Sequence, residues 1–139
     1  MQTEYIKKIL KARVYDLAVE TPVTAAESLS SRLGNEILIK REDLQPVFSF
    51  KLRGAYNKMV LLSDKEKAQG VVCASAGNHA QGVAMSAKHL GIRAVIVMPT
   101  ITPEIKVNSV KARGGEVVLK GDTFDEACRI AFELQKKEG

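Results

Sequence analysis

The sequence predicts an α/β fold in which helices cover a parallel sheet. Over the second half, short apolar segments alternate with longer segments of helical periodicity three times in succession, which is typical of a parallel sheet with right-handed crossovers. One apolar segment, Val95-Ile96-Val97, contains no polar residue, as expected of a strand covered on both faces. With 45% hydrophobic and 27% charged residues, the 139-residue chain has the composition of a globular protein, so we do not expect disorder.

The first half is expected to contain fewer regular elements. In order, they are an amphipathic helix over residues 6–13, an extended stretch at 21–26, a strand at 36–41, a helix that begins near 49 and a short helix after 63. Ser63 and Glu66 have the spacing of a capping box, which predicts the start of the short helix. Gly70 is expected to end it, because glycine readily adopts the backbone conformation of a helix C-terminus.

The second half is expected to contain three pairs of a strand and a helix. The strands are predicted at residues 71–74, 94–98 and 116–120, and the helices at 78–90, 103–113 and 124–137. Pro103 suits the first position of a helix, and Gly91 and Gly114 suit C-terminal caps. Thr123 and Glu126 form a second predicted capping box.

One lysine is a candidate nucleophile. Lys51 stands between apolar neighbours in the segment SFKLRGA, at the predicted start of a helix. The helix dipole, the rings of Phe48 and Phe50 and the like charge of Arg53 would all favour its neutral form. A neutral lysine can form a Schiff base with an aldehyde such as pyridoxal phosphate. On this segment alone, a solvated lysine on a surface helix is the alternative.

A second segment has the features of an anion-binding loop. The apolar residues 71–74 run into SAGNHAQG, which opens a predicted helix. Small residues let the backbone approach a ligand, and the N–H groups at a helix N-terminus would hold an anion such as a carboxylate. Ser75 and Asn78 offer side-chain hydrogen bonds there. An ordinary loop, with Ser75 or Asn78 as the helix N-cap, is the alternative.

Together, the two segments resemble the fold-type II pyridoxal-phosphate enzymes, and within them most closely the threonine dehydratases, also called threonine deaminases. The resemblance extends along nearly the whole chain. It includes Thr21-Pro22, Lys40-Arg41-Glu42-Asp43, Val97-Met98-Pro99 and Gly114-Gly115-Glu116-Val117. The stretch REDLQPVF before the lysine looks more like the biosynthetic type than the catabolic type.

The resemblance implies the N-terminal part of the fold-type II fold, which is tryptophan synthase beta-like. Residues 1–70 would form an incomplete N-terminal part of the large cofactor domain, and residues 71–139 a nearly complete small α/β subdomain. In relatives, a glycine-rich loop that cradles the cofactor phosphate lies beyond the position of Gly139. We therefore expect this chain to be the N-terminal part of a dehydratase and to be inactive alone.

The resemblance also implies roles for individual residues. Lys51 matches the Schiff-base lysine, which moves the α proton of the substrate, and Phe50 matches the aromatic residue near the cofactor ring. Asn78 matches the residue that hydrogen-bonds the phenolic oxygen of the cofactor. The loop that grips the substrate carboxylate matches Ser75, Ala76, Gly77, Asn78 and His79. His79 is therefore not expected to be a general base.

The implied reaction is the pyridoxal 5'-phosphate-dependent deamination of L-threonine to 2-oxobutyrate and ammonia, as in isoleucine biosynthesis. Serine would give pyruvate. Another fold-type II enzyme, such as a serine racemase or dehydratase, and a non-catalytic remnant that binds anions are the alternatives. The expected substrate is a small amino acid, and the parent enzyme is expected to be a homo-oligomer in the cytoplasm.

Several other classes are not supported by the sequence. The net charge of +5 is spread along the chain, and aromatic residues are too few for base-stacking platforms, so we expect no nucleic-acid partner. No run is long enough to span a bilayer and no signal peptide is visible, so we expect no membrane partner. Cys73, Cys128 and the two histidines lack the spacing of metal ligands, and we expect reduced thiols.

Nucleotide binding is the main enzymatic alternative for this fold class. Residues 77–82 have the glycine spacing of a P-loop. However, Val83 and Ala84 stand where a P-loop requires lysine and serine or threonine, and no G-x-G-x-x-G pattern occurs. The motifs therefore argue against a nucleotide site.

Overall fold

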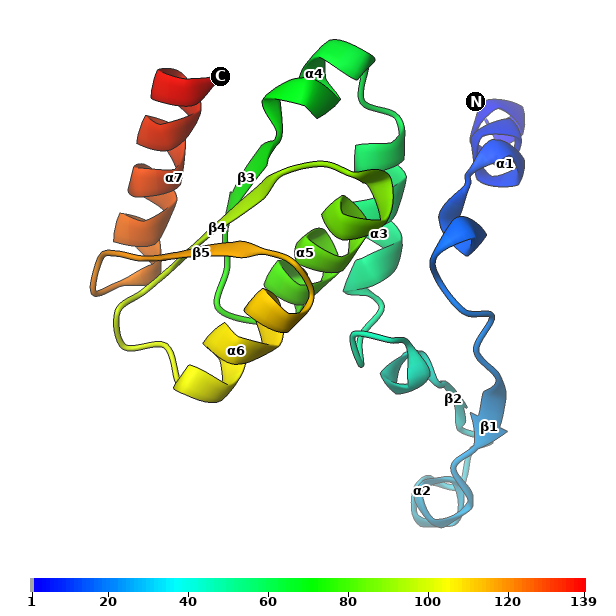
Figure 1. Ribbon diagram of the computed structural model, residues 1–139. Helices are drawn as coiled ribbons and strands as arrows, with labels where there is room; N and C mark the ends of the chain where they lie inside the picture. Colours follow the sequence, from blue (N-terminus) through cyan, green and yellow to red (C-terminus); the bar gives the residue numbers. More distant parts are fainter. Residues whose placement is uncertain (1) are drawn as a thin grey trace.

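The sheet of the second half is three-stranded and parallel, as predicted. The computed structural model of the chain describes residues 2–139. Its strands β3 (Val71–Ala74), β4 (Ala94–Met98) and β5 (Glu116–Leu119) lie in the order β3-β4-β5, so β4 is central (Figure 1). In the register of the sheet, Val72 lies opposite Val95.

Helices cover both faces of this sheet. α5 (Asn78–Leu90) and α6 (Glu104–Ala112) pack on one face, and α7 (Phe124–Glu138) packs on the other, against β3 and β4 (Figure 1). All five residues of β4 are buried, and the most exposed of them, Val95, keeps only 8% of its surface. The prediction of a strand covered on both faces is therefore confirmed.

α3 (Lys51–Val60) shares the core of the second half. It packs against α5 more extensively than any other two helices pack within residues 2–139. Its buried Ala55 and Met59 belong to one hydrophobic cluster with Ala80 of α5. The core therefore crosses residue 70, and the division into two domains at that residue stays a prediction.

The cap of the short helix α4 (Asp64–Gln69) follows the predicted chemistry. The Ser63 hydroxyl oxygen accepts the N–H of Glu66, and the Glu66 carboxylate accepts the N–H of Ser63, which completes the capping box. Gly70 ends this helix with a φ of 93°, and Gly91 ends α5 with a φ of 67°. Both glycines therefore use backbone conformations that other residues rarely adopt.

Three other helix ends differ slightly from the prediction. The Thr123 hydroxyl oxygen accepts the N–H of Glu126, but the Glu126 carboxylate accepts the N–H of Asp122 and not that of Thr123. Pro103 is the N-cap of α6 and not its first residue, and Gly114 follows the C-cap. At the start of α7, Asp122 therefore donates the N–H that was expected from Thr123.

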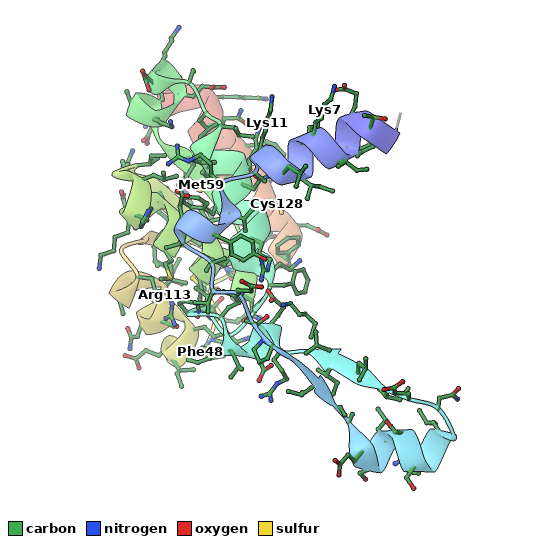
Figure 2. All side chains as sticks on the ribbon, turned by 90° about the vertical axis from the view of Figure 1, so that its right-hand side faces the viewer. Lys7, Lys11, Phe48, Met59, Arg113 and Cys128 are labelled. Atoms are coloured by element: carbon green, nitrogen blue, oxygen red, sulfur yellow. The ribbon has the colours of Figure 1, made fainter. Side chains whose placement is uncertain are left out.

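The first half consists of short elements. They are α1 (Gln2–Lys11), η1 (Val14–Asp16), β1 (Val23–Ala25), α2 (Glu27–Leu33), β2 (Leu38–Lys40) and η2 (Glu42–Leu44). β1 and β2 form an antiparallel ribbon, with Thr24 opposite Ile39, and Figures 1 and 2 show the ribbon and α2 projecting from the rest of the chain. α2 is missing from the predicted elements, since its N-cap Ala26 makes no side-chain hydrogen bond and the helix buries no residue.

Candidate active site

Lys51 is the first residue of α3, as predicted. The hydroxyl oxygen of the buried Ser49 accepts the backbone N–H of Lys51 at 3.2 Å and so gives one of the free N–H groups of the first turn a partner. The side chain of Lys51 is exposed, and its Nζ lies 5.0 Å from the centre of the Phe50 ring. Lys51 therefore presents a primary amine at the start of a helix, beside one aromatic ring.

The predicted desolvation of Lys51 is wrong for this chain. The rings of Phe48 and Phe50 are 71% and 58% exposed, so they do not shield the amine from water. The predicted like charge of Arg53 is offset, because its Nε pairs with the Glu42 carboxylate at 2.8 Å. Of the three predicted effects, only the position at the start of a helix is retained.

The backbone conformation of the turn before Lys51 explains why the rings of Phe48 and Phe50 are exposed to solvent. Val47 is fully buried and packs with Ala18 and Leu52, so it is the inward side chain of this segment. Phe48 has a φ of 56°, in the left-handed region where a bulky residue is strained. The chain turns at Phe48, and both aromatic rings remain largely in solvent.

The loop after β3 is built around Ser75. Its N–H donates to the carbonyl of Val97 at 3.1 Å, which fixes the loop to β4. Its hydroxyl oxygen accepts the N–H groups of Ala80 at 3.2 Å and Gly77 at 3.4 Å. Ser75 therefore supports the start of α5, which is close to its alternative prediction as a cap. The proton of the hydroxyl remains available to a ligand.

The other loop residues differ in exposure. Ala76 and Gly77 are half-buried, whereas Asn78 and His79 are exposed. α5 begins at Asn78, so its first backbone N–H groups have no partner within the helix and lie at the positive end of its dipole. A carboxylate or another small anion can bind at such a position.

α3 and α5 bring Lys51 to this loop. They meet at Gly82 of α5, where a Cβ atom would lie 3.2 Å from the backbone carbonyl carbon and oxygen of Lys51. Glycine therefore allows the two backbones to approach closely. Although His79 is exposed, partial loss of solvent around its ring and, secondarily, the charge of Lys51 lower its pKa. The backbone of Lys51 thus lies close to the helix that begins at the predicted loop.

An ion pair that was not predicted joins the first turn of α3 to the preceding segment. Arg53 donates to Glu42 through Nε at 2.8 Å and through Nη2 at 2.9 Å, and the Thr21 hydroxyl donates to Glu42 at 2.6 Å. The hydrogen bond from Arg53, aided by that from Thr21, lowers the pKa of Glu42 to about 2 in spite of partial burial. No local pattern reveals the contacts of Glu42 with Arg53 and Thr21, because these residues are 11 and 21 positions away.

Glu42 should make the free energy of unfolding of the chain depend on pH in the acidic range. Because folding lowers its pKa from 4.5 to about 2, the ionised carboxylate stabilises the fold above pH 4.5, and this contribution is lost as the pH falls toward 2. We expect Glu42→Gln to cost about 2 kcal/mol near neutral pH, after allowing for the solvent that reaches the pair, and progressively less in acid. Urea unfolding at several pH values measures this difference.

The neighbouring surface pair provides the control. Asp43 pairs with Arg41, but its side chain is 55% exposed, so Asp43→Asn should change the stability little. If the free energy of unfolding of Glu42→Gln followed the same pH dependence as that of the unsubstituted chain, Glu42 would not be the group responsible.

No second chemical site competes with this one in the part of the chain described. Between residues 2 and 139, no three His, Cys, Asp or Glu side chains gather as metal ligands would. Cys73 and Cys128 are free thiols, and burial raises the pKa of Cys73 to about 11. Over the same residues, no helix has both the length and the apolar composition to cross a membrane.

The chain is similar to enzymes of known activity over almost its whole length. It is 59% identical, over 97% of its residues, to the biosynthetic L-threonine dehydratase IlvA of Pasteurella multocida, of which it covers 26%. The processed form of threonine deaminase isoform 2 from Solanum lycopersicum matches with a TM-score of 0.94 at 58% identity, over 99% of this chain and 38% of that one. Maize serine racemase matches with a TM-score of 0.90 at 34% identity, over 96% of this chain and 41% of that one.

These similarities confirm the predicted resemblance. The threonine dehydratase and the threonine deaminase are closer to this chain in sequence than the serine racemase is. The chain spans about a quarter of the length of the curated relatives it matches. A family model described as "Pyridoxal-phosphate dependent enzyme" matches residues 14–139. The chain belongs to this family of pyridoxal-phosphate dependent enzymes.

Proposed function

We propose that the chain is part of a threonine dehydratase, which deaminates L-threonine to 2-oxobutyrate and ammonia. The observation that carries the proposal is the contact at Gly82, where the backbone of Lys51 lies against α5 about one turn from its N-terminus. The higher identity to threonine dehydratases supports threonine over the substrate of a serine racemase. L-Serine is a proposed second substrate, and it would give pyruvate.

The residues at the site fit the reactive end of pyridoxal 5'-phosphate. Within residues 2–139, no carboxylate forms an ion pair with Lys51, so its amine is available to an aldehyde. The exposed Phe50 offers an aromatic face beside that amine. When bound, the cofactor supplies an aldehyde that condenses with amines and an electron sink for the α carbon of the substrate.

Each residue has a proposed task in the reaction. Lys51 would hold the cofactor and take the proton from the α carbon of the substrate. The carboxylate of the substrate would bind at the N-terminus of α5, which holds the α carbon near Lys51. Asn78 would donate a hydrogen bond to the phenolic oxygen of the cofactor. The proposed carboxylate loop consists of Ser75, Ala76, Gly77, Asn78 and His79.

A homo-oligomeric enzyme in the cytoplasm belongs to the same proposal. α1 supports an assembly larger than the chain described, because its apolar face is exposed, with Ile9 at 70% and Leu10 at 80%. Apolar side chains grouped in this way usually contact another protein surface.

The division of labour in the loop can be tested in the full-length enzyme. Asn78→Ala should change the visible spectrum of the bound cofactor in the absence of substrate, because it removes a hydrogen bond to the cofactor. Ser75→Ala should leave that spectrum largely unchanged and raise the KM for threonine by roughly tenfold to a hundredfold, the value of a charge-assisted hydrogen bond. Spectra and initial rates of 2-oxobutyrate formation measure the two effects.

Because Ser75 also supports α5, its variant needs a stability control. Thermal unfolding should show a loss of about 1 kcal/mol for Ser75→Ala, as for a lost helix cap. Equal effects of both substitutions on the substrate-free spectrum would contradict the division of labour. A folded full-length enzyme that forms no 2-oxobutyrate from threonine would contradict the proposed function itself.

A further inference from the structure

Gln45 ties the segment before α3 to a distant part of the backbone. Its side-chain NH2 donates to the carbonyl of Val19 at 2.7 Å, and its side-chain oxygen accepts the N–H of Val19 at 2.9 Å. The amide therefore satisfies both backbone groups of a residue 26 positions away. Arg53, which pairs with Glu42, also donates through Nη2 to the same carbonyl at 3.2 Å.

These side chains form one network, which we call the Glu42 cluster. Its members are Thr21, Glu42, Gln45 and Arg53. Gln45 is 1% exposed and Thr21 is 4% exposed, while the side chains of Glu42 and Arg53 are 16% and 24% exposed. Polar groups that are buried in this way hold one geometry, because breaking a hydrogen bond would leave a donor or acceptor without a partner.

The Glu42 cluster includes residues on both sides of the turn that leads to Lys51. Gln45 lies at the beginning of the turn, and Arg53 follows Lys51 by two residues in the first turn of α3. Between them, Phe48 keeps its left-handed backbone with a φ of 56°. A strained conformation of a bulky residue persists only where the surroundings determine it. The cluster fixes the chain on both sides of this strained residue.

A second contact restrains the same turn from the sheet side of the molecule. Arg113, at the end of α6, donates through Nη1 to the carbonyl and hydroxyl oxygens of Ser109 at 3.0 and 2.7 Å. Its Nη2 donates to the carbonyl of Pro46 at 3.2 Å, and Figure 2 shows Arg113 and Phe48 near each other. The turn is therefore held to α6 as well as to the first half of the chain.

We propose that Gln45 and the Glu42–Arg53 pair are positioning residues for Lys51, which hold its backbone so that its amine reaches the loop at residues 75–79. The inference rests on the proposed function of Lys51 and adds the residues that set its place. Because the Lys51 side chain is exposed and has a flexible four-carbon stem, its reach depends on where its backbone is anchored. The Glu42 cluster supplies that anchor next to the reacting residue.

The test compares the reactivity of Lys51 with that of Lys58, which is exposed on the same helix. A neutral amine condenses with the aldehyde of pyridoxal phosphate and loses water, and borohydride then transfers hydride to the C=N bond, which leaves a stable pyridoxyl-lysine. Peptide mass spectrometry of the labelled chain gives the ratio of label at Lys51 to label at Lys58. This ratio should be well above one, because without substrate the anion position at the N-terminus of α5 is free to attract the phosphate of the reagent near Lys51.

Two variants address the cluster directly. Arg53→Lys keeps the charge but loses the two-bond contact with Glu42, and Gln45→Met keeps the size but loses both hydrogen bonds to Val19. Each should lower the labelling ratio by about tenfold. Circular dichroism shows whether each variant is folded, and if Gln45→Met does not fold, Arg53→Lys decides the question alone.

The matched control is Arg93→Lys. Arg93 makes the same kind of two-bond contact, to Glu116 at 2.9 and 3.1 Å, but it lies before β4 and away from α3. This variant should keep the labelling ratio of the unsubstituted chain. If it lowered the ratio as much as Arg53→Lys, the label would report a general loosening and the inference would be overturned.

The remaining outcomes separate the inference from the proposed function. A high ratio in the unsubstituted chain that stays unchanged in folded Arg53→Lys would refute the positioning role and leave the function of Lys51 intact. A ratio near one in the unsubstituted chain would count against the proposed function of Lys51, whatever the variants do.

Discussion

Replacing Lys51 by alanine should lower the turnover of threonine by at least about a thousandfold in the full-length enzyme. Lys51 is the amine proposed both to hold the cofactor and to move the α proton, and proton transfer by a positioned side chain alone contributes roughly 10² to 10⁴ in rate. The variant should also lose the visible absorption that arises when the cofactor condenses with a lysine. Formation of 2-oxobutyrate and the spectrum of the purified enzyme measure the two losses.

Two control variants distinguish the effect of losing the amine of Lys51 from the effects of losing its positive charge or of changing another lysine of the same helix. Lys51→Arg keeps the positive charge but offers no amine that can lose a proton, so it should be as inactive as Lys51→Ala. Lys58→Ala removes an exposed lysine from the same helix and should keep turnover within about twofold. Normal turnover in Lys51→Arg would mean that Lys51 acts only through its charge.

Amide hydrogens of β4 should exchange at least about a hundredfold more slowly than those of β2. β4 is paired on both sides, and its Ile96 and Val97 are fully buried. β2 pairs only with β1, and its Leu38 and Ile39 are 56% and 44% exposed. A two-stranded ribbon has little stability of its own, so β2 should exchange by local opening and β4 only by unfolding of the core.

Native-state hydrogen exchange at a single pH tests this order, by comparing residues 95–97 with residues 37–39. β5 serves as the internal reference, because it pairs with β4 on one side only and its Val117 and Val118 are half-buried. Its protection should lie between the other two. Equal protection of β2 and β4 would show that the ribbon unfolds together with the core.

The second half of the fold was predictable because local signals and packing agree there. The predicted helix at 78–90 and strand at 94–98 coincide with α5 and β4. A strand formed by a continuous apolar run is stable only when both of its faces are buried. The helices on the two faces of the sheet provide this burial. The errors are confined to the ends of elements: β5 ends at Leu119, one residue before the predicted end, and at the start of α7 Asp122 fills the role of the predicted residue.

The first half was less predictable because its elements are short and exposed. α2 has seven residues, lacks a side-chain cap and buries none of them, so neither periodicity nor a cap indicates it. The strand predicted at 36–41 is reduced to Leu38–Lys40, since it has only β1 as a partner. In the sequence, apolar residues that remain exposed in the fold give the same local pattern as apolar residues that are buried, so the pattern alone does not distinguish the two.

The candidate site shows the same distinction. Lys51 and the loop at 75–79 could be proposed as site residues because each lies in a contiguous motif. The direction of side chains in the turn could not be predicted, because Val47 and its aromatic neighbours are all apolar and only packing decides that Val47 points inward. The bond between Gln45 and Val19 links residues 26 positions apart, and a single sequence carries no signal for it.

At Gly82 the backbones of α3 and α5 lie against each other, so this contact contributes to the distance between Lys51 and the loop at residues 75–79. A Cβ atom at this position would require the backbone of α3 to give way by a few tenths of an ångström. One added methyl group at this position would therefore change directly how far the backbone of Lys51 stands from α5, even with every side chain of the Glu42 cluster in place. The free space between the backbones of α3 and α5 at residue 82 is thus smaller than the length of a carbon–carbon bond, and their close approach depends on glycine having no Cβ atom.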